Sequence, residues 1–209
     1  MEIAVYNIKG EATAYMVTLD DSVFAIEPND HAIYLDVKQF LANQRQGTHD
    51  TLEKSTISGS TKKLHKQKGT GGSRKGSIKS PLFRGGARVF GPHPRDYSFK
   101  LNKKLKRLAR KSALSYKVKD NNITILEDFT FETAKTKNFT ELLKNFQLSG
   151  KKVLLVLSKS DDNVFLSSRN LKKVKVVHAC DLNTYEILDA AQLLITADSV
   201  KEIEKIHQN

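Results

Sequence analysis

The sequence predicts an α/β protein whose mostly parallel sheet and flanking helices are interrupted by a long basic internal loop. In the second half of the chain, short apolar segments alternate with amphipathic segments of helical spacing. This alternation is typical of a parallel sheet with right-handed crossovers. Residues 47–98 break the pattern, because their large apolar side chains are widely spaced and follow no sustained period of two or 3.6.

The chain before the loop predicts a hairpin and then a helix. Apolar residues alternate on the two sides of a Lys9-Gly10 turn, at Ile3, Val5, Tyr15, Val17 and Leu19. Apolar residues at helical spacing follow at Ile33, Tyr34, Val37, Phe40 and Leu41. We expect Asn29 or Asp30 to cap this helix and the helix to end near Gln44.

The chain after the loop predicts a basic helix over 100–118. Its expected apolar stripe consists of Leu101, Leu105, Leu108, Ser112 and Tyr116, widened by Ala109 and Ala113. This stripe should pack on the globule, which leaves the cations of the helix for a phosphate backbone.

Strands and helices should alternate from there on. The expected strands are 123–126, 153–157, 174–177 and 193–195, and the expected helices are 137–147, 162–168, 185–190 and 199–207, the last capped by Asp198. Residues 153–157 are apolar on both faces, as a central parallel strand must be. The chain therefore divides into residues 1–46, a loop over 47–98, and residues 99–209.

Charge is concentrated in the middle of the chain. The formal net charge is +12, and between Arg45 and Lys111 there are 19 Lys and Arg against three Asp and Glu. The remainder carries 16 Lys and Arg against 20 Asp and Glu. A field of this kind favours a polyanionic partner, either nucleic acid or an anionic membrane.

The basic segment has the residue types that bind RNA. Arg and Lys neutralise phosphates, Gly lets the backbone approach them closely, and aromatic side chains such as Phe83, Phe90, His93, Tyr97 and Phe99 can stack on unpaired bases. The candidate RNA-binding cations are Arg45, Lys62, Lys63, Lys66, Lys68, Arg74, Lys75, Lys79, Arg84, Arg88, Arg95, Lys100, Lys103, Lys104, Arg107 and Lys111. Since such a loop buries little surface of its own, we expect it to need a partner for order.

Catalytic and metal-binding patterns are weak. Gly71 and Gly76 have Walker spacing, but no Lys follows them. Asp161-Asp162 is expected to be a turn and helix cap. The single cysteine, Cys180, excludes an internal disulfide and is expected to be a buried, inert thiol. We therefore expect no enzyme activity, no metal and no cofactor. With no apolar run long enough to cross a bilayer and no leader pattern, the chain is expected to be cytoplasmic.

Several motifs resemble those of the bacterial fourth large-subunit ribosomal protein family. The first is Gln67-Lys68-Gly69-Thr70-Gly71, followed by Gly76-Ser77-Ile78-Lys79-Ser80-Pro81. The others, in the same order as in the family, are Gly47-Thr48, Phe90-Gly91-Pro92-x-Pro94-Arg95-Asp96-Tyr97 and Asn102-Lys103-Lys104. The resemblance spans the chain.

The resemblance implies a Rossmann-like globule without a nucleotide, and a loop that extends through 23S-type rRNA to the wall of the peptide exit tunnel. It implies a role in subunit assembly, and some members of the family repress their own operon. Expected partners are rRNA, neighbouring large-subunit ribosomal proteins and the nascent peptide. The residues matching the loop tip are His65, Gln67, Lys68, Gly69, Thr70, Gly71 and Gly72. Family members commonly have an aromatic residue at position 65 and Arg at positions 66 and 72, where this chain has His, Lys and Gly.

Three other interpretations compete with this one. The first is an RNA-modifying α/β enzyme with a basic substrate loop. It would need a glycine turn after the first parallel strand, but residues 123–126 are followed by Glu127-Asp128-Phe129. The second is a membrane-surface protein that uses the basic helix, which the lack of Trp disfavours. The third is a disordered basic linker.

Overall fold

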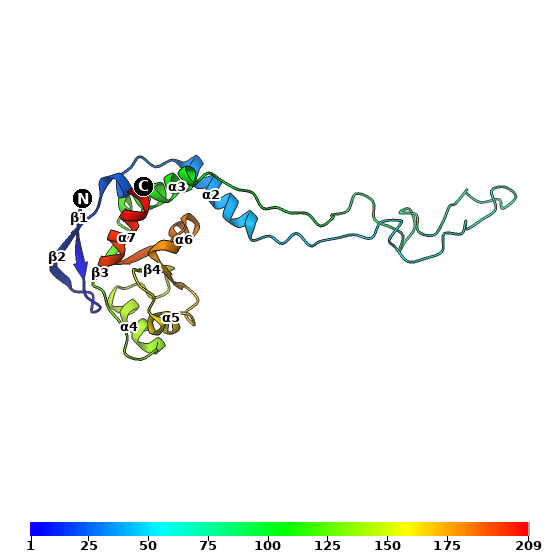
Figure 1. Ribbon diagram of the computed structural model, residues 1–209. Helices are drawn as coiled ribbons and strands as arrows, with labels where there is room; N and C mark the ends of the chain where they lie inside the picture. The colour runs from blue at the N-terminus through cyan, green and yellow to red at the C-terminus, as the bar shows by residue number, and fades with distance from the viewer. Residues whose placement is uncertain (209) are drawn as a thin grey trace. The chain divides into compact units, whose positions relative to one another are not determined.

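The computed structural model describes residues 1–208 of the chain, and the side chains of residues 1–207. The chain divides into two units (Figure 1). The α/β unit contains residues 1–41 and the chain from residue 100 onward, and the loop unit is Ala42–Phe99.

The α/β unit is built on one six-stranded sheet in the order β2-β1-β3-β6-β4-β5. Its strands are β1 Glu2–Tyr6, β2 Ala12–Thr18, β3 Ile123–Leu126, β4 Val153–Leu157, β5 Val174–His178 and β6 Gln192–Thr196. Only β1 and β2 pair antiparallel, and every other neighbouring pair is parallel. The predicted α/β class with a mostly parallel sheet is confirmed.

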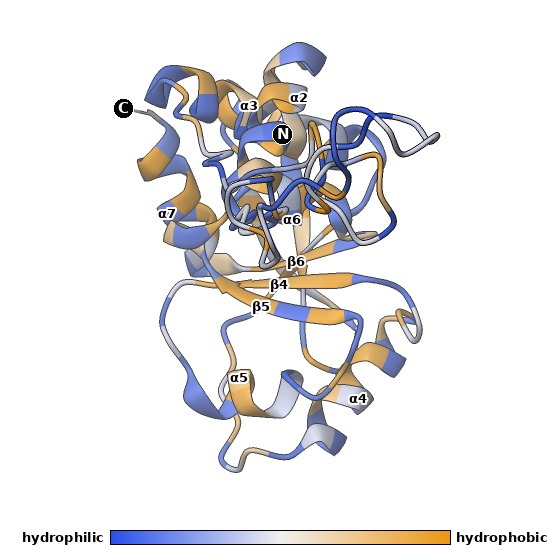
Figure 2. Ribbon diagram, turned by 90° about the vertical axis from the view of Figure 1, so that its right-hand side faces the viewer, coloured by the Kyte–Doolittle hydropathy of each residue, from blue (hydrophilic) through white to orange (hydrophobic). Residues whose placement is uncertain are grey.

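Helices cover both faces of this sheet. They are α1 Asp21–Phe24, α2 Asp30–Asn43, α3 Lys103–Lys119, α4 Thr136–Asn145, α5 Asp162–Ser168, α6 Thr184–Asp189 and α7 Ala197–Gln208, with a 3-10 turn, η1, at Ala179–Asp181. Figure 2 shows α4 and α5 on one side of the strands and α3, α6 and α7 on the other.

The core is divided into two layers by the alternation of side chains along the central strand β4. Leu154 and Val156 belong to the cluster shared with α1, α3 and α7, whereas Val153, Leu155 and Leu157 belong to the cluster shared with α4 and α5. Each such side chain, when fully buried, contributes about 1.5–3 kcal/mol to stability. The continuous apolar run in β4 therefore reflects burial on both faces, as expected.

Local signals place the elements where the sequence predicts them. Gly10 has a φ of +85° in the turn between β1 and β2. The Asn29 side chain accepts a hydrogen bond from the backbone N–H of Ala32 at 2.9 Å and so caps α2. Asp161 accepts from the backbone N–H groups of Asn163 and Val164, so its expected role as a helix cap is confirmed.

The predicted packing stripe of α3 was partly wrong. Leu108 is exposed, and Leu101 precedes the helix, whereas Leu114 and Lys117 are buried although they lie off the stripe. The C-terminal half of α3 lies among several helices, so burial there surrounds the helix and is not confined to one side. Lys117 is accommodated because its Nζ donates to the carbonyl of Ala190 at 2.7 Å, and burial lowers its pKa.

Three smaller expectations also need correction. Cys180 is exposed, because it lies in the η1 turn after β5 and not within the strand. Helix α7 begins at Ala197, so Asp198 lies in its first turn and does not cap it. The short helix α1 was not predicted, because its few residues are too short for a periodic signal; Asp20 caps it by accepting from the backbone N–H of Ser22.

Candidate nucleic-acid interface

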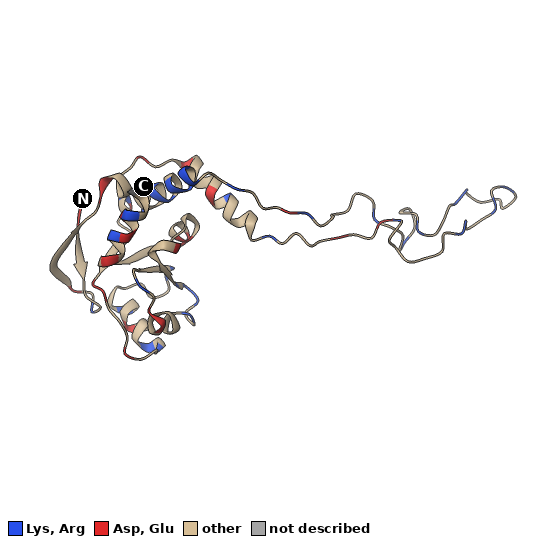
Figure 3. Cartoon of the chain, in the orientation of Figure 1, with Lys and Arg blue, Asp and Glu red and all other residues tan. Residues whose placement is uncertain are grey.

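The loop unit has a strongly positive charge. Ala42–Phe99 contains twelve Lys and Arg against three Asp and Glu. Between the end of α2 at Asn43 and the start of α3 at Lys103 there is no helix or strand. Figure 3 shows Lys and Arg at the far end of this unit and along α3.

The two arms of the loop unit run side by side and are joined by backbone hydrogen bonds. Near the base, the N–H of Arg95 donates to Gly47 at 3.1 Å and the N–H of Arg88 donates to Leu52 at 3.0 Å. Further out, the N–H of Leu64 donates to the carbonyl of Gly76 at 3.1 Å. Residues 65–75 lie beyond this last pair and form the tip.

Arg45 and Arg95 hold Tyr97 at the base of the loop unit. The guanidinium carbons lie 3.7 Å (Arg45) and 4.5 Å (Arg95) from the ring centroid of Tyr97. A hydrogen bond from Arg95, together with the charges of both arginines, lowers the pKa of the Tyr97 phenol. Cation–π contacts of this kind contribute about 0.5–1 kcal/mol each at exposed sites. They fix two of the predicted RNA-binding cations in place.

The acidic residues of the loop unit have partners of their own. His93 contacts Asp50 through Nδ1 at 3.1 Å and Glu53 through Nε2 at 3.0 Å. Asp96 accepts hydrogen bonds from the backbone N–H and from the hydroxyl of Ser98. Both hydrogen bonds lower the pKa of the Asp96 carboxyl, and the one from the backbone N–H has the larger effect. No Lys or Arg of the loop unit forms an ion pair with a carboxylate among the described residues. The positive charges are therefore available to an external anion.

Gly47 is required by the geometry of the loop base. Its φ is +69°, which residues with a side chain rarely adopt. A Cβ at this position would lie 2.1 Å from the carbonyl oxygen of Arg95 and 2.9 Å from the Tyr97 ring. The two arms can therefore meet here only because residue 47 has no side chain.

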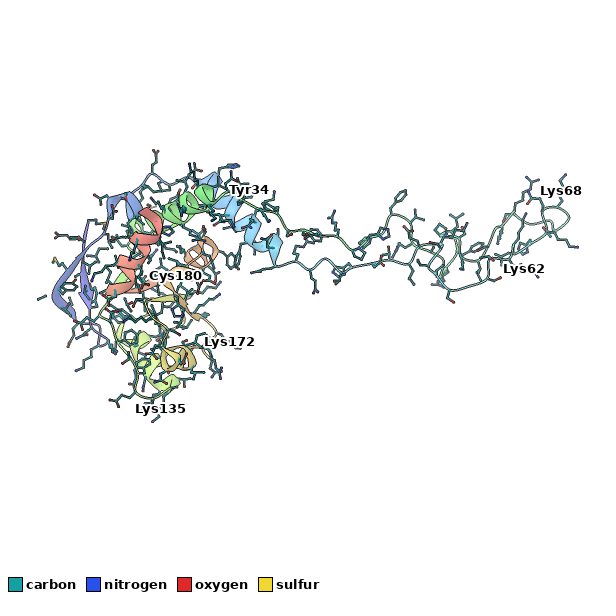
Figure 4. All side chains as sticks on the ribbon, viewed as in Figure 1. Tyr34, Lys62, Lys68, Lys135, Lys172 and Cys180 are labelled. Carbon is teal, nitrogen blue, oxygen red and sulfur yellow. The ribbon has the colours of Figure 1, made fainter. Side chains whose placement is uncertain are left out.

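Most of the predicted RNA-binding cations are exposed. The exposed ones are Arg45, Lys62, Lys63, Lys66, Lys68, Arg74, Arg84, Arg88, Arg95, Lys100, Lys103 and Lys104. The half-buried ones are Lys75, Lys79, Arg107 and Lys111. Every residue of the predicted tip, from His65 to Gly72, is exposed. Figure 4 labels Lys68 in the tip and Lys62 on the arm that leads to it.

The cations in the middle of α3 also lie near His207 of helix α7. His207 on α7 is buried, and its pKa is lowered to about 4, first by burial and then by the charges of Arg110, Lys111 and Arg107. The first turn of α3, with Lys103 and Lys104, is exposed. The part of α3 open to a polyanion is therefore its N-terminal part, and the middle of the helix is partly covered within the α/β unit.

The loop unit exposes apolar side chains that the sequence pattern did not predict to be exposed. Leu82 is 93% exposed and Phe90 fully so, and Phe90 adopts a φ of +57°. Tyr97 and His93, by contrast, already contact charged groups within the unit. Of the aromatic residues considered for base stacking, Phe90 is thus the most open. The signal for Leu82 was its place in Ser80-Pro81-Leu82-Phe83, a turn with no core to join.

The carboxyl ends of the parallel strands do not form a phosphate site. A cavity of about 780 Å³ lies there, lined by Asp128, Asp161, Asp162 and Asp198 together with Lys159. In α/β sheets ligands bind at this edge, but four carboxylates repel a nucleotide phosphate. Among residues 1–208, no group of three or more His, Cys, Asp or Glu could hold a metal ion, and no described helix is long and apolar enough to span a membrane.

Comparison with known proteins supports the family resemblance seen in the loop motifs. The family model described as "Ribosomal protein L4/L1 family" matches residues 17–206. The chain belongs to this family. It is 61% identical over 206 residues, 99% of each chain, to the large ribosomal subunit protein uL4 of Phocaeicola vulgatus. The proteins of that name from Parabacteroides distasonis and Christiangramia forsetii are 60% and 61% identical, with 98% of each chain covered.

Membership in this family decides between the interpretations of the basic segment. The family consists of ribosomal structural proteins and not of enzymes, so the RNA-modifying enzyme is excluded as an alternative. The match extends across the loop unit as well as the α/β unit. The family resemblance predicted from the loop motifs is therefore confirmed.

Proposed function

We propose that this protein is a structural constituent of the large ribosomal subunit, held there by rRNA that surrounds its loop unit. The observation that carries the proposal is a net-positive loop unit whose Lys and Arg have no carboxylate partners among the described residues. The chain is also about 60% identical to proteins named large ribosomal subunit protein uL4. Its place is then the ribosome in the cytoplasm, and its partners are rRNA and neighbouring ribosomal proteins.

Binding would work mainly by neutralisation of phosphates. Each Lys or Arg that meets a phosphate releases a condensed counterion, so affinity depends steeply on salt. If about eight cations take part, the logarithm of the affinity should fall with the logarithm of salt concentration at a slope on the order of −6. The predicted RNA-binding cations of the loop unit, together with Lys100, Lys103 and Lys104, are the residues proposed to do this.

The loop tip is the part proposed to reach the peptide exit tunnel. His65, Gln67 and the glycines Gly69, Gly71 and Gly72 are all exposed, and a Cβ at any of these three glycines would meet nothing within 4 Å. A tip without neighbours of its own can lie against rRNA on one side and a nascent peptide on the other. His65 can stack on a base in place of the aromatic residue that is common in the family.

Sedimentation of the native protein tests the proposal. Cell extract is resolved on a sucrose gradient at high salt, and the protein is followed with an antibody. We expect it to remain with the large subunit, because many phosphate contacts act together and much of the loop is enclosed. Recovery at the top of the gradient, while other large-subunit proteins stay bound, would contradict the proposal.

A further inference from the structure

Two identical Lys-Lys-Val segments lie side by side at the amino ends of two neighbouring parallel strands. Lys151-Lys152-Val153 leads into β4, and Lys172-Lys173-Val174 leads into β5. The two strands are parallel neighbours in which Val153 pairs with Val174. The backbone N–H of Val153 also donates to the carbonyl of Lys173 at 2.9 Å. The two lysine pairs are therefore adjacent, on strands about 4.8 Å apart.

A fifth lysine, Lys175, joins this group, which we call the lysine edge (Lys151, Lys152, Lys172, Lys173 and Lys175). All five side chains are exposed. Lys152, Lys172, Lys173 and Lys175 line a hollow of about 200 Å³ together with Glu186 and Asp189. A second hollow next to it is lined by Lys151, Lys152 and Lys117.

Internal partners neutralise only part of this charge. Lys152 pairs with Asp189 at 2.5 Å, and Lys175 pairs with Glu186. Lys173 donates to the carbonyl of Gly150 at 2.7 Å, which leaves its charge uncompensated. Neither Lys151 nor Lys172 has an ion pair among the described residues. Three positive charges thus remain on one small surface.

The clustering stands out against the rest of the chain. Outside residues 45–111 the chain has more Asp and Glu than Lys and Arg, 20 against 16. Five of those sixteen cations lie in the lysine edge, at the amino ends of β4 and β5. The cavity at the carboxyl ends of the parallel strands is instead lined by Asp128, Asp161, Asp162 and Asp198. Adjacent like charges repel one another, and an anion bound over them would relieve this repulsion.

We propose that the lysine edge is a second RNA-phosphate contact, formed by the α/β unit and separate from the cations of residues 45–111. Lysine ammonium groups suit phosphate as point charges and do not read base edges, so this contact would position the globule on an RNA backbone without selecting a sequence. The inference rests on the proposed function, because RNA is the polyanion that the ribosome supplies.

The test uses the full-length protein and in vitro transcribed 23S-type rRNA, with affinity measured over a salt series. The variant Lys151→Gln/Lys172→Gln removes the two lysines of this group that form no ion pair within residues 1–208. The control Lys135→Gln/Lys144→Gln removes two exposed lysines beside and within α4, at the same cost in net charge. Figure 4 labels Lys172 and Lys135, one from each pair.

We expect the lysine-edge variant to reduce the salt slope by about 1.5, which corresponds to two phosphate contacts, and to bind several-fold more weakly at low salt. The control should keep the wild-type slope, and Lys151→Arg/Lys172→Arg should retain binding because it keeps the charge. Identical slopes for the lysine-edge variant, the control and the wild type would overturn the inference.

The same series separates the inference from the proposed function. A wild-type salt slope near zero would contradict the proposed function itself, whatever the slopes of the variants. A steep wild-type slope that the lysine-edge variant leaves unchanged would contradict only the proposal of a second RNA contact. If that variant keeps wild-type RNA affinity but loses binding to poly-glutamate, the lysine edge is a surface for acidic protein and the inference is wrong.

Discussion

The α/β unit and the loop unit of this chain are stabilised in opposite ways. In the α/β unit, residues such as Leu155, Val156 and Leu194 are completely buried between sheet and helices. In Ala42–Phe99, Ala87 is the one buried side chain, and six large apolar residues are exposed. Burial of apolar surface is the main force that offsets chain entropy. The α/β unit therefore contains what it needs to fold, and the loop unit lacks it and carries positive charge in its place.

This contrast predicts that RNA binding and folding stability depend on different units of the chain. Changes in the loop unit should alter RNA binding and leave the stability of the α/β unit alone. Changes in the core should lower stability and leave the RNA affinity of the folded protein alone.

Removal of the loop should have the largest effect. Replacing residues 47–98 by two glycines is feasible because the backbone N–H of Phe99 lies 3.2 Å from the Asn43 side chain, so the two ends are close. We expect the thermal unfolding transition to persist and the affinity for 23S-type rRNA to fall by a factor of about 10³ or more at moderate salt. Filter binding and circular dichroism measure the two quantities. Unchanged RNA affinity would show that the loop is not the main contact.

A cavity in the core tests the other half of the contrast. Leu155 is fully buried in the centre of β4, and Leu155→Ala should lower the free energy of unfolding by about 2–5 kcal/mol. Denaturant titration gives this value. Measured at a temperature where the variant is folded, its RNA affinity should match that of the wild type, and a parallel loss of affinity would argue against separate roles.

Much of this division could be predicted from the sequence. The β3 and β4 boundaries agree with the structure because short apolar-rich segments and their flanking turns are local signals. Asp161 was predicted to be a helix cap for the same reason, and of the two candidates Asn29 and Asp30 the structure has Asn29 as the cap of α2. The loop was found by composition, since nine of the eleven glycines and most of the positive charge lie in it or beside it.

What was missed depends on tertiary contacts. The burial of Leu114 and Lys117 follows from the neighbours of α3, and Lys117 finds its acceptor at Ala190, which is distant in sequence. The lysine edge could not be seen as one surface either, because Lys151-Lys152 and Lys172-Lys173 become neighbours only through the pairing of β4 with β5. The contact of each predicted RNA-binding cation with rRNA stays a prediction.

The base of the loop unit can be disrupted by a single methyl group. Gly47→Ala would place a Cβ 2.1 Å from the Arg95 carbonyl oxygen, in a backbone conformation that alanine adopts poorly. We expect a loss of RNA affinity of about tenfold, which corresponds to roughly 1.4 kcal/mol of strain, without a change in thermal stability. Gly76→Ala is the matched control, because Gly76 lies in the same unit but outside the tip and nothing lies within 4 Å of its Cβ. Equal affinities for the two variants would mean that the loop base does not need this geometry.

The smallest expected effect concerns pH. The pKa of His207 is about 4 in the folded protein and near 6.5 when the residue is exposed, so the unfolded state takes up the proton first as pH falls. The contribution of His207 to the free energy of unfolding is therefore fully present above about pH 6.5 and is lost between pH 6.5 and 4, by about 1–3 kcal/mol in total.

Substitution by a residue that does not titrate isolates this effect. His207→Gln should flatten the stability profile between pH 6.5 and 4 relative to wild type, as measured by urea denaturation at each pH. Because His207 lies in the α/β unit, RNA affinity at neutral pH should not change. A profile as steep as that of the wild type would place the proton uptake on another group.

Amide hydrogen exchange, with and without 23S-type rRNA, tests the central claim most directly. Free protein should show strong protection in β3, β4 and β6 and little between residues 47 and 98, because few buried contacts support the loop's hydrogen bonds. Addition of the RNA should protect the loop unit and leave the sheet as it was. Strong protection of residues 47–98 in RNA-free protein would contradict the view that RNA supplies the order of this unit.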